Sequence, residues 1–154
     1  MKKKLSNIIE IERIIKKSIA FRLAMCDNNI PYLIPLCFGY KDNIIYFHSM
    51  NRGKKLKILK KNSKVCFEFD NDLRVISHAK ACSWNMNFNS VVGTGTATLI
   101  EDIDEKKKAL DIIVNQYSDK EYKYPDKVLN ITSVFKIDIE SISGRLSEYS
   151  NKTN

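Results

Sequence analysis

The amino-acid sequence predicts a mainly β protein, a small antiparallel barrel of six strands with helices at its margins. The first observation is a series of short apolar or alternating segments separated by tight turns that contain Asn and Asp. The second is that the chain lacks the strand–helix–strand alternation that builds a parallel sheet. The third is a length of 154 residues with 44% hydrophobic composition, which suits one domain over residues 1–154, ordered from about 7 to 146.

The N-terminal part of the chain is typical of one helix followed by a three-strand meander. Residues 7–17 place their isoleucines on one helical stripe, and residues 18–26 alternate as a strand does. Residues 30–40 are apolar on both faces, but Pro31 and Pro35 remove two ladder donors. We therefore expect this strand to be interrupted or to lie at an edge, before a turn leads into a third strand at residues 44–49.

A Lys-rich helix is expected at residues 52–61. At 100° per residue most of its lysines fall on one side, with Leu56 and Leu59 on the opposite side. Lys55 alone projects toward the apolar side, between Ile58 and Leu59. The other lysines suit a solvated helix face, whereas Lys55 either extends along apolar surface to solvent or binds a ligand. The projection favours the ligand role for Lys55.

The second half of the chain supplies the remaining strands. Residues 64–69 form the fourth strand, residues 70–87 are less regular, and residues 88–100 form a long strand with Gly93 and Gly95 on one face. Two glycines on one strand face predict either a close approach to the backbone or a sharp bend. A helix follows Asp102, residues 119–130 form a polar loop, residues 133–140 form the last strand, and residues 147–154 are expected to fray.

Composition narrows the classes of function. The chain has 26 basic and 18 acidic residues, a net charge of +8, but the excess is concentrated near residues 2–4 and 52–64, and no known nucleic-acid-binding motif is visible. The sequence has neither a membrane-length apolar run nor a signal-peptide core, so we expect a cytoplasmic protein without membrane contact. The four cysteines lack metal-ligand spacing and are expected to be buried free thiols, with no metal site.

The junction between the third strand and the basic helix carries the clearest chemical signal. The strand ends in His48 and Ser49, and Gly53 opens the helix. Free N–H groups and the helix dipole both favour an anion at such a start, and Lys55 adds a mobile positive charge. The junction therefore predicts the phosphate end of a cofactor site. Because side chains fill a small barrel, the cofactor must lie outside it, in a groove completed by another element or subunit.

Five motifs in this order resemble those of the pyridoxamine 5'-phosphate oxidase-like flavin-binding split barrels, and in particular their nitroimidazole-resistance, or nitroimidazole-reductase, branch. The resemblance extends from about Ile8 to Arg145. The motifs are P-x-x-x-P-L-x-F-G-Y at Pro31–Tyr40, Ile45-Tyr46-Phe47-His48-Ser49, Gly53-x-Lys55-Leu56, Val65-Cys66-Phe67-Glu68 and Phe88-x-Ser90-Val91-Val92-Gly93.

The resemblance implies a six-stranded split barrel and a homodimer with flavin mononucleotide (FMN) at its interface. It implies that His48 lies near the flavin ring or substrate as the catalytic group, and that Ser49, Lys55 and Ser90 lie at the phosphate and ribityl side. The remaining residues expected at the cofactor are Pro35, Leu36, Gly53, Lys54, Trp84, Phe88, Asn89 and Val91. The resemblance implies that residues Trp84 to Ser90 come from the partner subunit.

One position departs from the family pattern. Relatives often have Tyr, then Arg or Lys, then Ser where this chain has Phe88, Asn89 and Ser90. Asn89 therefore removes a positive charge that relatives offer to the phosphate. Lys54 or Arg52 could substitute for that charge.

The expected function is that of an FMN-dependent oxidoreductase. It would pass electrons from NAD(P)H or another donor to a small acceptor, for example a nitroimidazole or another nitroaromatic compound. One alternative is a haem-binding split barrel with His48 or His78 as the iron ligand. Another is a basic nucleic-acid-binding module.

Overall fold

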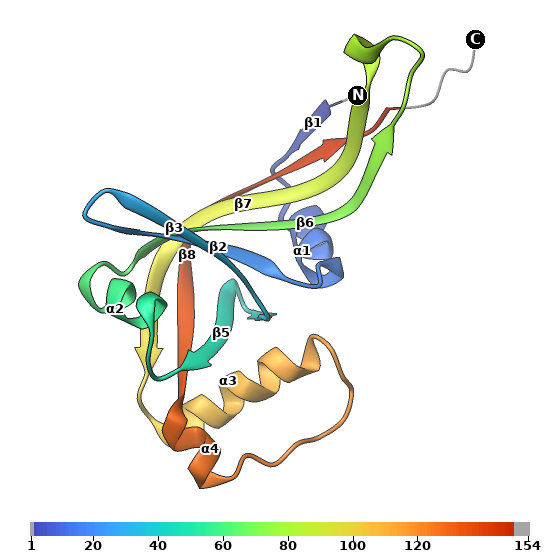
Figure 1. Cartoon of the computed structure of the whole chain (residues 1–154). Helices are drawn as coiled ribbons and strands as arrows, with labels where there is room; N and C mark the ends of the chain where they lie inside the picture. Colours follow the sequence, from blue (N-terminus) through green and yellow to red (C-terminus); the bar gives the residue numbers. More distant parts are fainter. Residues whose placement is uncertain (1, 150–154) are drawn as a thin grey trace.

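The computed structural model describes residues 2–149, which form one antiparallel sheet of eight strands with helices at its margins (Figure 1). The strand order is β3–β2–β6–β7–β8–β5–β4, and β1 pairs with the C-terminal part of β8. The strands are β1 (Lys2–Leu5), β2 (Phe21–Asp27), β3 (Ile30–Leu36), β4 (Gly39–Lys41), β5 (Ile44–Met50), β6 (Lys64–Ile76), β7 (Asn85–Ile100) and β8 (Thr132–Ser147). The helices are α1 (Ile8–Lys17), α2 (Lys54–Lys61), α3 (Ile103–Asn115), α4 (Asp126–Ile131) and the 3-10 turn η1 (Ala81–Ser83).

The mainly β, antiparallel, split-barrel fold is confirmed, but the count of six strands is wrong. The segment 30–40 divides into β3 and β4, and the N-terminal residues add β1. β3 and β4 are the two edge strands of the sheet order, because each pairs with one neighbour only. The sheet is therefore not closed. The two prolines of β3 thus lie on an edge strand, where a missing N–H donor costs no ladder bond.

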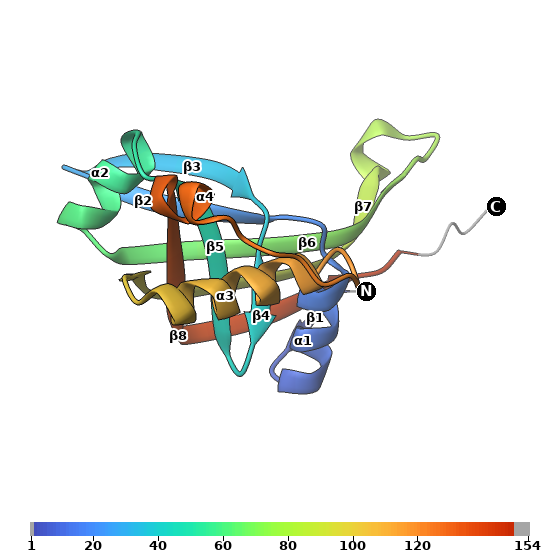
Figure 2. The same cartoon turned by 90° about the horizontal axis from the view of Figure 1, so that it is seen from below.

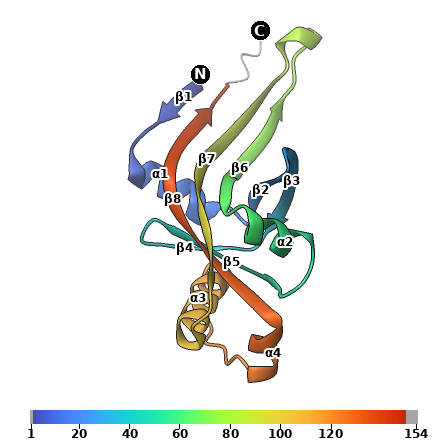
Figure 3. The same cartoon turned by 90° about the vertical axis from the view of Figure 1, so that its left-hand side faces the viewer.

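The region between residues 70 and 87 is more regular than expected. β6 continues to Ile76 and β7 begins at Asn85, so the two strands form a hairpin arm that extends away from the rest of the sheet (Figures 1 and 3). A bulge interrupts their pairing between Asn71 and Arg74, with Asp72 at a positive φ of 56°. The sequence did not predict the full length of β6, because this bulge breaks the two-residue alternation along the strand.

The C-terminal boundary also differs from expectation. β8 runs to Ser147, which is buried and donates its hydroxyl to the Met86 carbonyl oxygen, so residue 147 is not frayed. Residues 150–154 lie outside the described residues. The predicted polar loop at 119–130 contains the short helix α4, whose Leu129 is fully buried.

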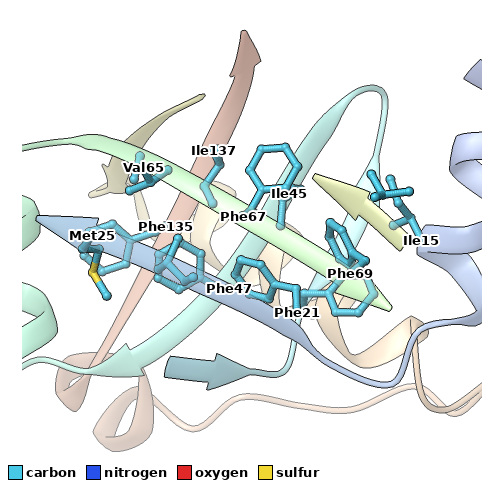
Figure 4. Close-up of a cluster of buried hydrophobic side chains, with 14 of the residues drawn as sticks. Ile15, Phe21, Met25, Ile45, Phe47, Val65, Phe67, Phe69, Phe135 and Ile137 are labelled. Atoms are coloured by element: carbon cyan, nitrogen blue, oxygen red, sulfur yellow. The ribbon is translucent and has the colours of Figure 1, made fainter. Parts of the chain in front are cut away.

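The core is filled by side chains, as expected for a barrel of this size. Phe21, Phe47, Phe67 and Phe69 are almost completely buried within it, and the Phe47 ring stacks on Phe135 with centroids 5.1 Å apart (Figure 4). Each such ring contributes roughly 1.5–3 kcal/mol through burial. A smaller cluster lies where α3 and α4 pack on the β5 and β8 side of the sheet (Figure 2). A ligand as large as a cofactor would therefore have to bind outside the core.

Within residues 2–149, three features bear on the class of protein. No helix there has the length and apolar character that a bilayer crossing requires. No group of three or more His, Cys, Asp and Glu side chains in that range gathers into a possible metal site. The cysteines are free, but the expectation of burial is wrong, since Cys37 and Cys82 are exposed and Cys26 and Cys66 are half-buried. Cys37 lies at the break between β3 and β4, and Cys82 at the tip of the arm.

Candidate functional site

The end of β5 and the start of α2 form the first half of the candidate site. His48 and Ser49 lie near the end of β5, and Gly53 is the N-cap of α2 with φ of 110°. A side chain at Gly53 would meet open space, but this φ strongly favours glycine. Because Gly53 offers no side-chain cap, the first N–H groups of α2 are left for solvent or a ligand. This is the geometry of an anion cradle.

The helical projection that separated Lys55 from the other lysines of α2 is confirmed. Lys55 is half-buried, whereas Lys54, Lys57 and Lys60 are exposed. The Lys55 Nζ atom lies 5.7 Å from the centroid of the Phe47 ring, on the core side of the helix. Lys54 is directed elsewhere, with its Nζ 4.5 Å from the Tyr32 ring centroid on β3. Lys55 is therefore the lysine of α2 that reaches toward the end of β5.

This half of the candidate site carries positive charge, and its Lys55 and His48 side chains are partly shielded from solvent. Burial lowers the pKa of Lys55 below its ordinary value. Burial, and then the Lys55 charge, lower the pKa of His48. Both shifts mean that a positive charge is disfavoured here in the absence of an anion. A bound phosphate would remove that penalty, so the half-site is suited to an anionic group.

Acid is expected to destabilise the ligand-free protein partly through His48. Its folded-state pKa lies below the ordinary value of 6.5, so the unfolded chain takes up the proton first as the pH falls. The contribution of His48 to stability is present above the ordinary pKa and is lost as the pH falls through the folded-state pKa. His48→Gln should therefore lose less thermal stability than the parent protein between about pH 7.5 and 5, measured by circular dichroism. The exposed His78→Gln serves as the control, and equal losses in His48→Gln and the parent would contradict this prediction.

Three other residues predicted to bind the cofactor are Ser49, on β5, and Pro35 and Leu36, on β3. The Ser49 hydroxyl donates to the Met50 carbonyl oxygen at 3.0 Å, which leaves its oxygen able to accept from a ligand. Pro35 and Leu36 end β3, where they pair with Arg22 and Phe21 of β2. The cation–π contact of Lys54 with Tyr32 joins α2 to this strand.

The residues from Trp84 to Val91 form a second half at the arm. Trp84 lies at the tip, 54% exposed, and its indole N–H donates to the His78 carbonyl oxygen at 2.7 Å. Asn89 donates to Asn71 and Asp72, which fastens the bulge at the base of the arm, and Val91 is fully buried in the core. Phe88 and Ser90 are half-buried.

A cavity of about 420 Å³ lies at the base of this arm. Arg74 and the C-terminal part of β8 contribute to it, and sequence reasoning did not single out either. The alternation of β6 could not reveal Arg74, because the bulge shifts the strand register. The lining residues are Asp72, Leu73, Arg74, Asn87, Phe88, Asn89, Ser147 and Glu148.

The fold places the two halves far apart within one chain. His48 pairs with Val134 near the start of β8, and Ser90 pairs with Arg145 near its end. At about 3.3 Å per residue, the stretch of β8 between those partners is roughly 35 Å long when measured along the strand, which sets an upper limit on their separation. His48 and Ser90 therefore pair with opposite ends of β8.

The outer face of β2 and β6 carries an ion-pair cluster that the sequence reasoning missed. The Arg22 guanidinium donates to Glu68 at 2.9 Å and to Asp70 at 2.8 Å. Burial raises the pKa of Glu68, and Arg22 opposes that rise. The alternation of β2, which puts Arg22 on the face opposite to Phe21, was the available signal, but the partners of Arg22 depend on strand register.

Comparison with known proteins agrees with the motifs. The family model for pyridoxamine 5'-phosphate oxidase matches residues 9–146. No curated protein matches the chain. Among solved structures, one from Bacteroides thetaiotaomicron, provisionally assigned to 5-nitroimidazole antibiotic resistance, is 29% identical with a TM-score of 0.84, covering 96% of this chain and 92% of its own.

Two further structures share the fold at lower identity. An FAD and haem binding protein from Mycobacterium smegmatis is 18% identical with a TM-score of 0.86, over 96% of this chain and 74% of that one. An FAD-binding protein from Mesorhizobium loti is 24% identical with a TM-score of 0.71, over 96% and 99%. The match across residues 9–146 confirms the resemblance that the five motifs indicated, and the chain belongs to the pyridoxamine 5'-phosphate oxidase family.

Proposed function

We propose that this protein is a flavin-dependent oxidoreductase that binds FMN at an interface between two copies of the chain. The observation that carries the proposal is the cradle formed by Gly53, Lys55 and His48. Support also comes from the family and from neighbours that are named as flavin-binding proteins.

In this proposal the residues of the cradle have separate roles. The N–H groups that follow Gly53 and the Lys55 ammonium hold the phosphate by charge-assisted hydrogen bonds, and the Ser49 hydroxyl assists them. His48, exposed beside Lys55 and with a lowered pKa, orients the acceptor and exchanges a proton with it near neutral pH. FMN, when bound, supplies the electron transfer from NAD(P)H or another donor to a small acceptor such as a nitroaromatic compound.

The dimer in this proposal follows from the separation of the two halves. Ser90 pairs with Arg145 near the end of β8, whereas His48 pairs with Val134 near its start, so we expect Ser90 and Phe88 to reach that cradle from another subunit. The apolar side chains exposed on the arm suit contact with a second copy; they are Leu73, Val75, Trp84 and Met86.

The proposal is tested by flavin content and assembly state. The purified protein, supplied with FMN, should show flavin absorbance, release FMN on denaturation and sediment as a dimer in analytical ultracentrifugation. A protein that neither retains FMN nor binds it in a fluorescence titration would refute the proposed function. A monomer that binds FMN as well as the dimer would refute the shared site.

Haem is a second candidate, because a structural neighbour is named as binding both FAD and haem. His48 is the imidazole of the cradle and could ligate iron. Titration with haem should then give a Soret band that disappears in His48→Ala but persists in His78→Ala. A protein that takes up FMN and gives no such band is a flavoprotein only.

A further inference from the structure

The outward side of α2 carries a run of positive charge with no acidic residue beside it in the sequence. Between Asp42 and Glu68 the chain has no Asp or Glu. The basic residues of this stretch are Arg52, Lys54, Lys55, Lys57, Lys60, Lys61 and Lys64. Lys55 turns toward the core, whereas the other lysines of α2 are exposed. We call these exposed side chains the lysine face of α2; they are Lys54, Lys57, Lys60 and Lys61.

The lysine face does not stabilise the helix that carries it. Acidic side chains stabilise the first turn of a helix, because they complement its dipole. α1 and α3 both have acidic residues in the first turn, but α2 has none there and begins with Lys54. Lys57 is also followed by Lys60 at i+3 and by Lys61 at i+4, positions at which like charges repel. The charges of α2 therefore point to a role outside the fold.

Two of these lysines have no acidic partner in the described part of the chain. Lys61 pairs with Asp27 at 3.4 Å. Lys57 and Lys60 form no ion pair among residues 2–149. Their ammonium groups are therefore available to a partner that meets the exposed side of the helix.

The chemistry of the lysine face favours the carboxylates of a protein. From Lys54 to Lys61 it extends about 10 Å along the helix axis, a spread that suits several separate carboxylates better than one phosphate. Nucleic-acid surfaces add aromatic rings on which bases stack, but here the Lys54 Nζ lies over the Tyr32 ring at 4.5 Å. Membrane surfaces need apolar side chains beside the basic ones, and the apolar side chains of α2 are buried.

We propose that the lysine face of α2 docks an acidic electron-carrier protein, which donates electrons to the flavin held by the inward-facing Lys55. This inference rests on the proposed function, because it names the electron donor of the same site. A helix is about 10 Å thick with its side chains, so a protein docked on the outside of α2 lies close to the cradle. Interfaces between redox partners are small and are steered by charge, which one short basic helix can provide. Each encounter oxidises the carrier by one electron, so two encounters and two protons from solvent reduce one FMN.

Docking is measured first on the protein without FMN, so that this result does not depend on the cofactor. The probe is a plant-type ferredoxin, an acidic iron–sulfur protein that carries one electron. Its affinity, measured by isothermal titration calorimetry, should fall steeply as salt is added. Lys57→Glu/Lys60→Glu should weaken the affinity about tenfold or more at low ionic strength, because like charges then face each other. The variant is expected to fold, since the pairs of position 57 with Lys54 and Lys61 become attractive.

Electron transfer is measured next on the FMN-loaded protein, by anaerobic stopped-flow absorbance. The rate constant for reduction by reduced ferredoxin should fall about tenfold or more in Lys57→Glu/Lys60→Glu at low ionic strength. Photochemically reduced 5-deazariboflavin, a small uncharged donor, needs no docking surface. It should reduce the parental protein and the variant at rates within about twofold of each other.

Lys16→Glu/Lys17→Glu is the matched control, because it changes the net charge by the same amount. Both lysines are exposed on α1, which lies well apart from α2 (Figures 1 and 3). Screening limits their influence on a partner docked at α2, so this variant should keep the parental affinity for ferredoxin within about twofold. A loss as large as that of Lys57→Glu/Lys60→Glu would show that net charge, and not the lysine face, governs binding, and would overturn the inference.

The outcomes separate this inference from the proposed function. A protein that accepts electrons from 5-deazariboflavin, but whose docking and reduction by ferredoxin are absent or equal in the parent and in Lys57→Glu/Lys60→Glu, would overturn the inference alone. Dissociation of a dimer in that variant, or loss of binding to a random-sequence DNA duplex with unchanged ferredoxin docking, would assign the lysine face to a second copy or to nucleic acid instead. A parental protein that does not bind FMN would overturn both.

Discussion

Replacing Lys55 by Ala is expected to weaken FMN binding by about tenfold to a hundredfold, the range for losing a charged hydrogen bond. Lys55 is the lysine of α2 that is half-buried, and its Nζ lies 5.7 Å from the Phe47 ring centroid. A phosphate at the start of α2 would meet this ammonium where solvent screens the attraction least. The measurement is a fluorescence titration of the protein with FMN at fixed ionic strength.

Lys57→Ala is the matched control, since Lys57 lies two residues further along α2 and is exposed. It should change FMN affinity by no more than about twofold, the effect of one screened surface charge. Lys55→Met separates charge from packing, because it keeps most of the apolar stem and should bind FMN as weakly as Lys55→Ala. Equal effects of Lys55→Ala and Lys57→Ala would show that the position of Lys55 on the helix does not matter for the cofactor.

The position of Lys55 could be predicted from the sequence because it depends on one helix only. The 100° rotation per residue and the pattern of leucines determine which lysine leaves the solvated face. The strands at β2 and β5 were predictable for the same reason, since alternation is a local property. The prolines likewise predicted that the segment 30–40 is interrupted or lies at an edge, and the segment both divides into β3 and β4 and places β3 at an edge.

Features that depend on strand register could not be predicted in this way. Asn89 was expected at the cofactor, but its amide bonds to Asn71 and Asp72, which lie close only because a bulge shifts the β6–β7 pairing. Arg145 was expected near the end of the ordered chain, and its place beside Ser90 follows from the pairing of β8 with β7. These pairings join residues distant in sequence, and no local period specifies them.

Local sequence patterns therefore predict only one of the two halves of the candidate site. Its His48 and Lys55 half is built by one continuous strand–helix segment, and that segment alone predicts an anion cradle. Its Ser90 half lies at the far end of β8, and the sequence shows neither that distance nor the arm that extends beyond it. The family resemblance implies that both halves meet at one cofactor, and in the fold they pair with opposite ends of β8.

Replacing Gly93 by Ala is expected to destabilise the fold by about 3 kcal/mol or prevent folding, at the upper end of the usual cost of overpacking. A Cβ at Gly93 would overlap the Phe67 ring and the Ser141 carbonyl oxygen, which belong to the strands on either side of β7. The backbone oxygen cannot move without disturbing the β7–β8 ladder, and Phe67 is almost completely buried. Thermal and urea denaturation of the ligand-free protein measure the effect.

Val92→Ala provides the control for Gly93→Ala, because Val92 is the preceding residue on β7 and faces outward, exposed. It should cost less than about 1 kcal/mol, as surface substitutions usually do. Phe67→Leu tests the cause directly, since it removes the ring atoms that meet the new Cβ. If the overlap is responsible, the loss in Gly93→Ala/Phe67→Leu will be smaller than the sum of the two single losses. Additive losses would mean that the close approach of Phe67 is not the cause, and that the glycine is required by the Ser141 carbonyl oxygen or by the bend of β7 beside the Thr94–Gly95 irregularity.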